Sequence, residues 1–391
     1  KKLNFMKILL ICKEMIAYER TAIMVLGSKL KEAGHEVRAA VLRQPVAKKE
    51  VKKKKKFKFK FLLHSEAYAN KSADEVLQNT NLESGINHNK QNNNISKFQE
   101  ALEKAKKFKP DVVGYSVMTG EHYEILEFNK ILKQEINFVS VMGGPHPAFN
   151  KDVIEEEGLD AICTGEGDIA FNAFINKLEN NEEYWLTKSF YVKHKGEIYK
   201  NGLSELVHDL NDLPFPDREI LYDADPNLAE VGLKSFIAGR GCPYKCSYCF
   251  NKQYNENYKG LGQIIRARSP EKVIQEIEGV LKNYTLDMVN MNDDVFMLKP
   301  NGWLKEFGKL YKERINLPFS CNVRASSVKE DDIIALKEAG LTHVWMGVEC
   351  GDEKAANEIF LRHTTNETII KVNTLLRSSC CVRYETHPQT V

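Results

Sequence analysis

Short apolar runs alternate with helical patterns along most of this 391-residue chain. In its first half, strands are predicted at Lys7–Cys12, Glu36–Leu42, Asp111–Ser116, Phe138–Met142 and Ala161–Thr164. Helices are predicted between and after them at Thr21–Ala33, Phe98–Lys107, Tyr123–Gln134, Lys151–Glu157 and Ile169–Leu178. Alternation of this kind produces a parallel sheet covered by helices on both faces, and ligands of such α/β sheets bind beyond the carboxyl ends of the strands.

The second half repeats the alternation after a predicted hairpin, Ser189–Val192 with Glu197–Tyr199, and a proline-stiffened link at 210–218. Strands are predicted at Lys234–Ala238, Met288–Met291, Phe319–Val323, His343–Gly347 and Cys381–Glu385. Helices are predicted at Pro270–Lys282, Gly302–Arg314, Glu330–Ala339 and Ile369–Arg377. Repeated βα units with polar residues just past the strands are typical of a TIM-type barrel.

Three cysteines follow the first strand of this second series, with the spacing C-x3-C-x2-C: Cys242, Cys246 and Cys249. Three thiolates are too few for a closed structural zinc site, and the downstream cysteines that might have completed one lie in no C-x2-C pair. Those are Cys321, Cys350, Cys380 and Cys381. A disulfide framework does not fit nine scattered cysteines without a secretory segment. An iron–sulfur cube with one open iron is favoured over zinc or inert thiols.

The cysteine run, with the aromatic Tyr248 before its last cysteine, resembles the defining motif of the radical SAM superfamily. The resemblance implies that Cys242, Cys246 and Cys249 hold a [4Fe–4S] cluster whose open iron binds S-adenosylmethionine. It also implies that residues after the barrel strands contact S-adenosylmethionine: Asp293 and Asp294, Arg324 as partner of its carboxylate, and Glu349, which contacts it or orients Arg324. Cys350 stands where related sequences carry serine.

Glycine-rich loops follow three strands of the first half: Ser116-Val117-Met118-Thr119-Gly120, Gly143-Gly144-Pro145-His146-Pro147 and Gly165-Glu166-Gly167-Asp168. Glycine lets the backbone approach a large flat ligand closely, although each loop alone also fits ordinary turn chemistry. Together they resemble the cobalamin-binding domain that precedes the barrel in one radical SAM subfamily. The resemblance implies cobalamin contacts from Ser116, Thr119, Gly143, Gly144, Gly165 and Glu166.

One motif of cobalamin proteins is absent, the Asp-x-His-x-x-Gly sequence that supplies a cobalt-ligating histidine. The first loop instead reads Cys12-Lys13-Glu14-Met15-Ile16-Ala17-Tyr18. His146, between two prolines, is interpreted as a loop residue rather than a ligand. Glu166 or Asp168 is expected to cap the helix that begins near Ile169.

The composition is that of an ordinary globular protein, with 42% hydrophobic and 28% charged residues and a formal net charge of +2. This balance argues against general nucleic-acid binding. No apolar run is long enough to span a membrane, and Lys1–Leu10 lacks the features of a signal peptide, so a cytoplasmic location is expected. The lysine-rich stretch Lys48–Phe61 and the polar stretch Asn87–Lys97 are interpreted as a solvated insertion, with a nucleic-acid or membrane patch as the alternative.

The predicted domains are a flavodoxin-like or Rossmann-like cobalamin-binding domain at 1–185, with an insertion at about 46–97, and a hairpin and linker at 186–230. An incomplete radical SAM barrel follows at 231–391. A six-strand partial barrel would continue beyond Val391, so we expect either that the chain is truncated or that its tail contains elements that the sequence pattern does not reveal. The resemblance implies a methyltransferase that uses a 5′-deoxyadenosyl radical and methylcobalamin on an unactivated carbon of a small molecule, with flavodoxin or ferredoxin as electron donor. A cyclase or rearrangement enzyme, a relative that has lost cobalamin, and a non-catalytic cofactor-binding fragment are the alternatives.

Overall fold

The computed structural model describes residues 5–14, 19–43, 91–378 and 381–386. The chain divides into two compact units, a larger one of Lys1–Leu42 with Ala101–Val391 and a smaller one of Arg43–Glu100. Most of the insertion predicted at about 46–97 lies outside the described residues. The exception is the backbone at the start of α4 (Gln91–Phe108), a helix that the sequence predicted to begin only at Phe98.

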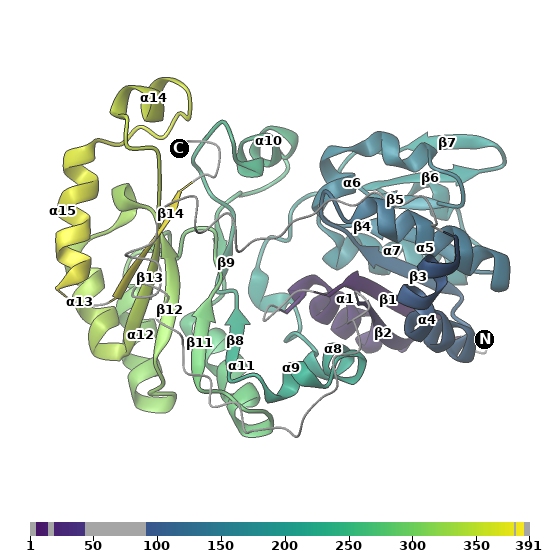
Figure 1. Ribbon diagram of the computed structural model, residues 1–391, viewed down its shortest axis with the longest axis horizontal. Coiled ribbons are helices and arrows are strands. Elements are labelled where there is room, and N and C mark those ends of the chain that lie inside the picture. The colour runs from purple at the N-terminus through teal and green to yellow at the C-terminus, as the bar shows by residue number, and fades with distance from the viewer. Residues whose placement is uncertain (1–4, 15–18, 44–90, 379–380, 387–391) are drawn as a thin grey trace. The chain divides into compact units, whose positions relative to one another are not determined.

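The first sheet of the larger unit has seven strands in the order β2-β1-β3-β4-β5-β6-β7 (Figure 1). Their bounds are β1 (Lys7–Lys13), β2 (Glu36–Leu42), β3 (Val112–Ser116), β4 (Val139–Gly143), β5 (Ala161–Cys163), β6 (Phe190–His194) and β7 (Glu197–Lys200). The first five strands are parallel, and their order, 2-1-3-4-5, is the flavodoxin-like order, which confirms the predicted fold. The β6–β7 hairpin extends the same sheet, with β6 antiparallel to β5.

The helices of this part cover both faces of the sheet, so its strands are continuous apolar runs such as the fully buried Ile8–Ile11. They are α1 (Thr21–Glu32), the end of α4, α5 (His122–Glu135), α6 (Pro145–Phe149) and α7 (Gly167–Glu179). Two predictions were wrong here. The helix expected at Lys151–Glu157 is a 3₁₀ turn at Lys151–Glu155, and the preceding loop contains α6, because proline is tolerated in the first turn of a helix.

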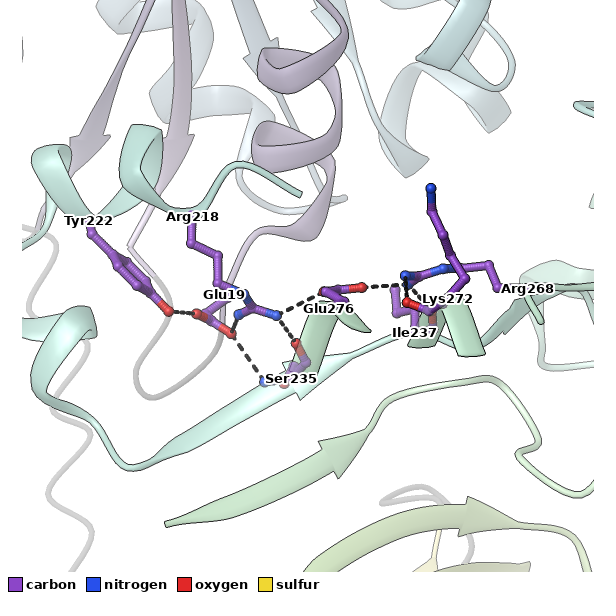
Figure 2. Close-up of polar contacts among 8 residues, drawn as sticks. All are labelled: Glu19, Arg218, Tyr222, Ser235, Ile237, Arg268, Lys272 and Glu276. Carbon is purple, nitrogen blue, oxygen red and sulfur yellow. Dashed lines mark hydrogen bonds and ion pairs between the residues drawn. The ribbon is translucent and has the colours of Figure 1, made fainter. Parts of the chain in front are cut away.

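The link between the two sheets is held by buried charges. It contains the 3₁₀ turn Leu210–Asp212 and the helices α8 (Arg218–Ala224) and α9 (Asn227–Glu230). Arg218 of α8 donates to Glu19 at 2.5 Å, to the Ser235 carbonyl at 2.7 Å and to Glu276 at 3.2 Å (Figure 2). Glu19 also accepts from the Tyr222 hydroxyl, so the segment before α1 is tied to α8 and to the start of the second sheet.

The second sheet has five parallel strands in the order β14-β13-β12-β11-β8 (Figure 1). Their bounds are β8 (Leu233–Phe236), β11 (Met288–Met291), β12 (Phe319–Val323), β13 (Leu341–Glu349) and β14 (Cys381–Thr386). The helices that follow are α11 (Pro270–Asn283), α12 (Trp303–Arg314), α13 (Glu330–Ala339), α14 (Glu353–Glu358) and α15 (Asn366–Arg377). Within the described residues the sheet stays open rather than closing into a barrel.

Several short elements of this part were not predicted, among them α14 and the 3₁₀ turn Ala325–Ser327. The strands β9 (Gly239–Arg240) and β10 (Arg266–Ala267) pair antiparallel beside the cysteine loop, and α10 (Phe250–Asn257) begins directly after Cys249. Elements of two to eight residues carry too little hydrophobic periodicity to be identified from sequence. None of the helices in the described parts of the chain is both long and apolar enough to cross a membrane.

Candidate active site

The three cysteines lie on one loop that leaves β9 and ends at α10. The loop begins at Gly241, where φ is +92° and an added Cβ would lie 2.1 Å from the Ile264 carbonyl oxygen, so only glycine fits. Cys242 and Cys246 are buried, and Cys249 is half-buried at the N-cap of α10. The sharp turn therefore sets three thiols at the carboxyl-end side of β8, where barrel ligands bind.

The surroundings of the thiols fit a metal cluster. Burial raises the pKa of Cys242 to about 11, and the neighbouring Asp294 and the other two thiols add to the rise. Bound iron reverses this preference, because a metal-coordinated thiol is deprotonated. In the described part of the chain no three His, Cys, Asp or Glu side chains converge on a single metal ion. An iron–sulfur cube does not require that convergence, since each of its thiolates binds a different iron.

Arg324 lies against the cysteine loop. Its guanidinium is buried, with Nη1 3.2 Å from the Cys246 Sγ, Nε bonded to Ser326 at 2.8 Å, and its centre 3.9 Å from the Tyr244 ring centroid. The Glu349 carboxylate faces Arg362, with Arg362 Nη1 3.4 Å from its Oε1. The expectation that Glu349 contacts S-adenosylmethionine or orients Arg324 stays a prediction; the arginine that pairs with it in the structure comes from the segment after α14.

The two aspartates after β11 have different environments. Asp293 is buried, accepts from the Ala238 amide at 3.0 Å and pairs with Lys299 at 2.8 Å, so its carboxylate is already engaged within the protein. Asp294 is exposed and lines a cleft of about 210 Å³ beside Gly241, Asn251 and Tyr254. Asp293 lines the same cleft, and Asp294 is the more exposed of the two aspartates.

A larger cavity, of about 320 Å³, lies at the carboxyl ends of β1, β3, β4 and β5. Of the six predicted cobalamin residues, the structure brings five to its lining: Ser116, Gly143, Gly144, Gly165 and Glu166. Apolar side chains complete the wall, among them Leu10, Val141 and Phe171. A slot with glycine on one side and hydrocarbon on the other suits a flat aromatic group, so the residues present fit the nucleotide tail of cobalamin.

The sixth predicted residue, Thr119, is not part of that lining. It is exposed, and its hydroxyl lies 3.3 Å from Nδ1 of His146. His146 is buried within α6, and its ring stacks on His122 with centroids 3.9 Å apart. Burial, and secondarily the charge of His122, lower the pKa of His146. The interpretation of His146 as a loop residue was therefore wrong in its secondary structure.

Glu166 and Asp168 bind arginines of the second half instead of capping α7, which corrects the capping prediction. Asp168 receives both Nη atoms of Arg240, at 2.7 and 2.9 Å. Glu166 receives Arg266 at 2.7 and 3.0 Å and the Tyr254 hydroxyl at 2.9 Å. Burial alone would raise the pKa of Glu166, but these hydrogen bonds and the two arginine charges lower it to about 2.

Arg240 joins the two candidate sites. It lines both the 320 Å³ cavity and the 210 Å³ cleft, and it immediately precedes Gly241 and Cys242. Gly165 borders the same junction: an added Cβ would lie 2.3 Å from the Tyr258 hydroxyl, which accepts from the Glu166 amide. The glycine-lined cavity and the cysteine loop thus share a wall built from charged and tyrosine side chains.

Sequence reasoning missed three arginines of these sites: Arg240, Arg266 and Arg362. Arg240 could have been found, because it adjoins the cysteine run and follows a predicted strand. Arg266 and Arg362 stand in no recognisable pattern, and their partners Glu166 and Glu349 lie elsewhere in the sequence. Only the fold brings these charges together.

Comparison with known families divides the chain in the same way. Residues 71–175 match the model of the B12 binding domain, and residues 236–382 match that of the Radical SAM superfamily. An uncharacterized methyltransferase of Pyrococcus horikoshii is 26% identical over 285 residues, which cover 71% of this chain and 60% of the relative. The anaerobic magnesium-protoporphyrin IX monomethyl ester cyclase of Rubrivivax gelatinosus is 26% identical over 295 residues, covering 72% of this chain and 50% of the cyclase.

Among solved structures, the fold is similar to that of the cobalamin-dependent S-adenosylmethionine radical enzyme OxsB with aqua-cobalamin and S-adenosylmethionine bound. The TM-score is 0.70 at 18% identity, and the match covers 98% of this chain and 49% of OxsB. The chain therefore spans roughly half of the length of these proteins. At this identity the likeness concerns the fold alone.

Proposed function

We propose that this chain, which belongs to the radical SAM superfamily and carries a B12-binding domain, is a cobalamin-dependent methyltransferase acting on an unactivated carbon of a small molecule. The radical SAM domain implies a [4Fe–4S] cluster and S-adenosylmethionine as cofactors, and the B12-binding domain implies cobalamin. Bound together, these groups supply carbon radical chemistry and a transferable methyl group.

The single observation that carries the proposal is the position of Arg240 between the glycine-lined cavity and the cysteine-loop cleft. A methyl transfer that needs both cofactors requires that both can reach the same substrate atom, so their sites must adjoin. In this chain Asp168 and Glu166 hold one side of the shared wall, while Arg240 and Arg266 hold the other. The P. horikoshii relative, named as a methyltransferase, supports the same reading.

We assign the chain's own residues the following roles. Cys242, Cys246 and Cys249 hold the cluster, and the Arg324 guanidinium offsets negative charge at the Cys246 sulfur. Asp294 and Glu349 present carboxylates at the strand ends, where they can bind the polar groups of S-adenosylmethionine. Ser116, Gly143 and Gly144 line the slot for the cobalamin tail. A flavodoxin or ferredoxin is the proposed electron donor.

The test is anaerobic reconstitution with iron, sulfide and hydroxocobalamin, followed by desalting, reduction and addition of S-adenosylmethionine labelled in its methyl group. We expect retained cluster and corrinoid absorption, and formation of both S-adenosylhomocysteine and 5′-deoxyadenosine. Formation of neither compound by fully loaded protein would indicate a non-catalytic cofactor-binding fragment. A cluster without corrinoid would refute the cobalamin-dependent proposal.

A cyclase or rearrangement enzyme is the second candidate, because the R. gelatinosus relative is a cyclase. Such an enzyme would use the same cluster and cavity without moving a methyl group. The two candidates differ in one product of the same experiment. 5′-Deoxyadenosine without S-adenosylhomocysteine from loaded protein would favour the cyclase.

A further inference from the structure

Arg362 connects the cysteine loop with the end of β13. Its side chain is 5% exposed, and its Nη1 donates to the Tyr248 hydroxyl at 2.5 Å. Nη2 donates to the Gly347 carbonyl at 2.5 Å, and Nη1 lies 3.4 Å from the Glu349 carboxylate. One guanidinium thus joins Tyr248, which lies between two predicted cluster ligands, to Glu349, the last residue of β13.

The segment that carries Arg362 is fastened to the same loop at two further points. The Ser247 amide donates to the Phe360 carbonyl at 3.1 Å, and the Ser247 hydroxyl donates to the Ile359 carbonyl at 2.7 Å. The Phe360 ring meets the Tyr248 ring edge to face, with centroids 5.7 Å apart. Residues 359–362 therefore pack along the loop at Ser247 and Tyr248, immediately before Cys249.

The backbone around Arg362 adopts an uncommon conformation to make these contacts. Leu361 has φ of +54° and His363 has φ of +48°, so both neighbours of Arg362 lie in the left-handed region although neither is glycine. Glu349, its ionic partner, has φ of +67°. Left-handed non-glycine residues concentrate at functional sites, where surrounding contacts hold them in place.

We infer that Arg362 is a positioning residue for S-adenosylmethionine: it fixes Tyr248 beside the cluster ligands and Glu349 at the strand end, and so shapes the site at the open iron. The inference rests on the proposed function only in assuming that the cysteine loop holds the cluster. A guanidinium suits this task, because its planar fork can bind a hydroxyl, a carbonyl and a carboxylate at once, which the single ammonium of lysine does not reproduce.

The test uses the full chain loaded with its cluster, without and with added cobalamin, in the variants Arg362→Gln, Arg362→Lys and Tyr248→Phe. Three quantities are measured: iron per chain, the change in the electron paramagnetic resonance spectrum of the reduced cluster on adding S-adenosylmethionine, and the Kd from that titration.

We expect Arg362→Gln to keep its iron, to weaken S-adenosylmethionine binding about tenfold and to alter the bound-state spectrum. Arg362→Lys should recover part of the affinity. The double variant Arg362→Gln/Tyr248→Phe should bind about as weakly as Arg362→Gln alone, because both changes break the same contact.

The matched control is His363→Ala, which alters an exposed neighbour with the same left-handed backbone and should change the Kd less than about twofold. An Arg362→Gln protein with full iron and unchanged Kd would overturn the inference. If Arg362→Gln loses its iron, the Tyr248→Phe variant provides the test. Weaker binding of S-adenosylmethionine by Tyr248→Phe with full iron content supports the inference, and unchanged binding overturns it. Because binding is also measured without cobalamin, a failure of methyl transfer or corrinoid binding would refute the proposed function and leave this test intact.

Discussion

The guanidinium of Arg240 donates hydrogen bonds to both carboxylate oxygens of Asp168, at 2.7 and 2.9 Å. Arg240 stands one residue before Gly241 and the cysteine loop, and Asp168 lies in the first turn of α7, next to the glycine-lined cavity. The pair gains further from the start of α7, where a carboxylate is favoured by the helix dipole. A bidentate contact fixes the relative orientation of the two side chains as well as their distance. The Arg240–Asp168 pair therefore holds in place the wall that the two candidate cofactor sites share.

Replacing Arg240 by lysine is expected to keep both cofactors and to lower the rate of methyl transfer about tenfold or more. Lysine preserves the charge but makes a single, flexible contact, and a small misplacement of reacting groups costs one to two orders of magnitude in rate. The measurement is the initial rate of S-adenosylhomocysteine formation alongside iron and corrinoid content. The control is Arg38→Lys, an exposed arginine of β2 paired with Glu36. Wild-type turnover by Arg240→Lys would show that the bidentate geometry is not needed.

The buried charges of the link predict a large stability loss when one partner is removed. Glu19 and Arg218 are 5% and 3% exposed, and Glu19→Gln would leave Arg218 with Glu276 as its remaining carboxylate partner among the charges in Figure 2. Breaking a buried pair from one side costs about 3 kcal/mol, since the remaining charge stays buried. Urea unfolding of the cluster-free chain measures this cost. Glu36→Gln, which breaks an exposed pair, serves as the control; equal losses from the two variants would refute the argument.

Much of the fold could be predicted because buried parallel strands can be recognised in the sequence as continuous apolar runs. Strands such as Lys7–Lys13 and Phe319–Val323 were located to within a residue, and a parallel sheet followed from the alternation. The flavodoxin-like order was one of the two folds expected from the family resemblance. The short helix at Pro145–Phe149 was missed, since two prolines normally indicate a loop. The local hydrophobic pattern of the sequence therefore predicts buried strands well. It does not predict short helices and strands that are held in place by tertiary contacts.

The candidate site was predictable only where its residues are neighbours in sequence. The cysteines and glycine loops are such neighbours, and the structure puts the glycine loops around one cavity. The ion pairs are not: Glu166 looks like a helix cap until the fold brings Arg266 to it, and no local pattern indicates that Glu349 pairs with Arg362. Charge pairing depends on how strands and loops are placed in space, which no local spacing encodes.

Filling the cavity provides a direct test of the cobalamin assignment. The Cβ of a side chain at Gly143 would have as its nearest neighbours Cys163 Cβ at 3.7 Å and the Tyr115 carbonyl at 3.9 Å, ordinary contacts that strain nothing. Gly143→Leu should therefore fold, keep its iron and occupy space that the cobalamin tail needs. We expect corrinoid retained after desalting to fall at least tenfold, measured by absorption.

Gly202→Leu is the matched control, because an added Cβ there meets no atom within 4 Å and the residue lines neither site. It should retain corrinoid like the wild type. Normal corrinoid content in Gly143→Leu would place cobalamin outside this cavity.

Glu166 should make the stability of the chain depend on pH in an acidic window. Its pKa is about 2 in the folded chain, against an ordinary value of 4.5, because the hydrogen bonds and charges of Arg266 and Arg240 outweigh its burial. A carboxyl with a depressed folded pKa stabilises fully above the unfolded value and loses that contribution as pH falls through the folded value. At 1.36 kcal/mol for each unit of pKa, Glu166 contributes about 3 kcal/mol to the free energy of unfolding at pH 7, and this contribution declines between about pH 4.5 and 2.

The test is urea unfolding of the cluster-free wild type and of Glu166→Gln at pH 7, 4 and 3. The difference between their free energies of unfolding should shrink below pH 4.5. A difference that stays constant over this range would mean that Glu166 does not gain its stability through ionisation.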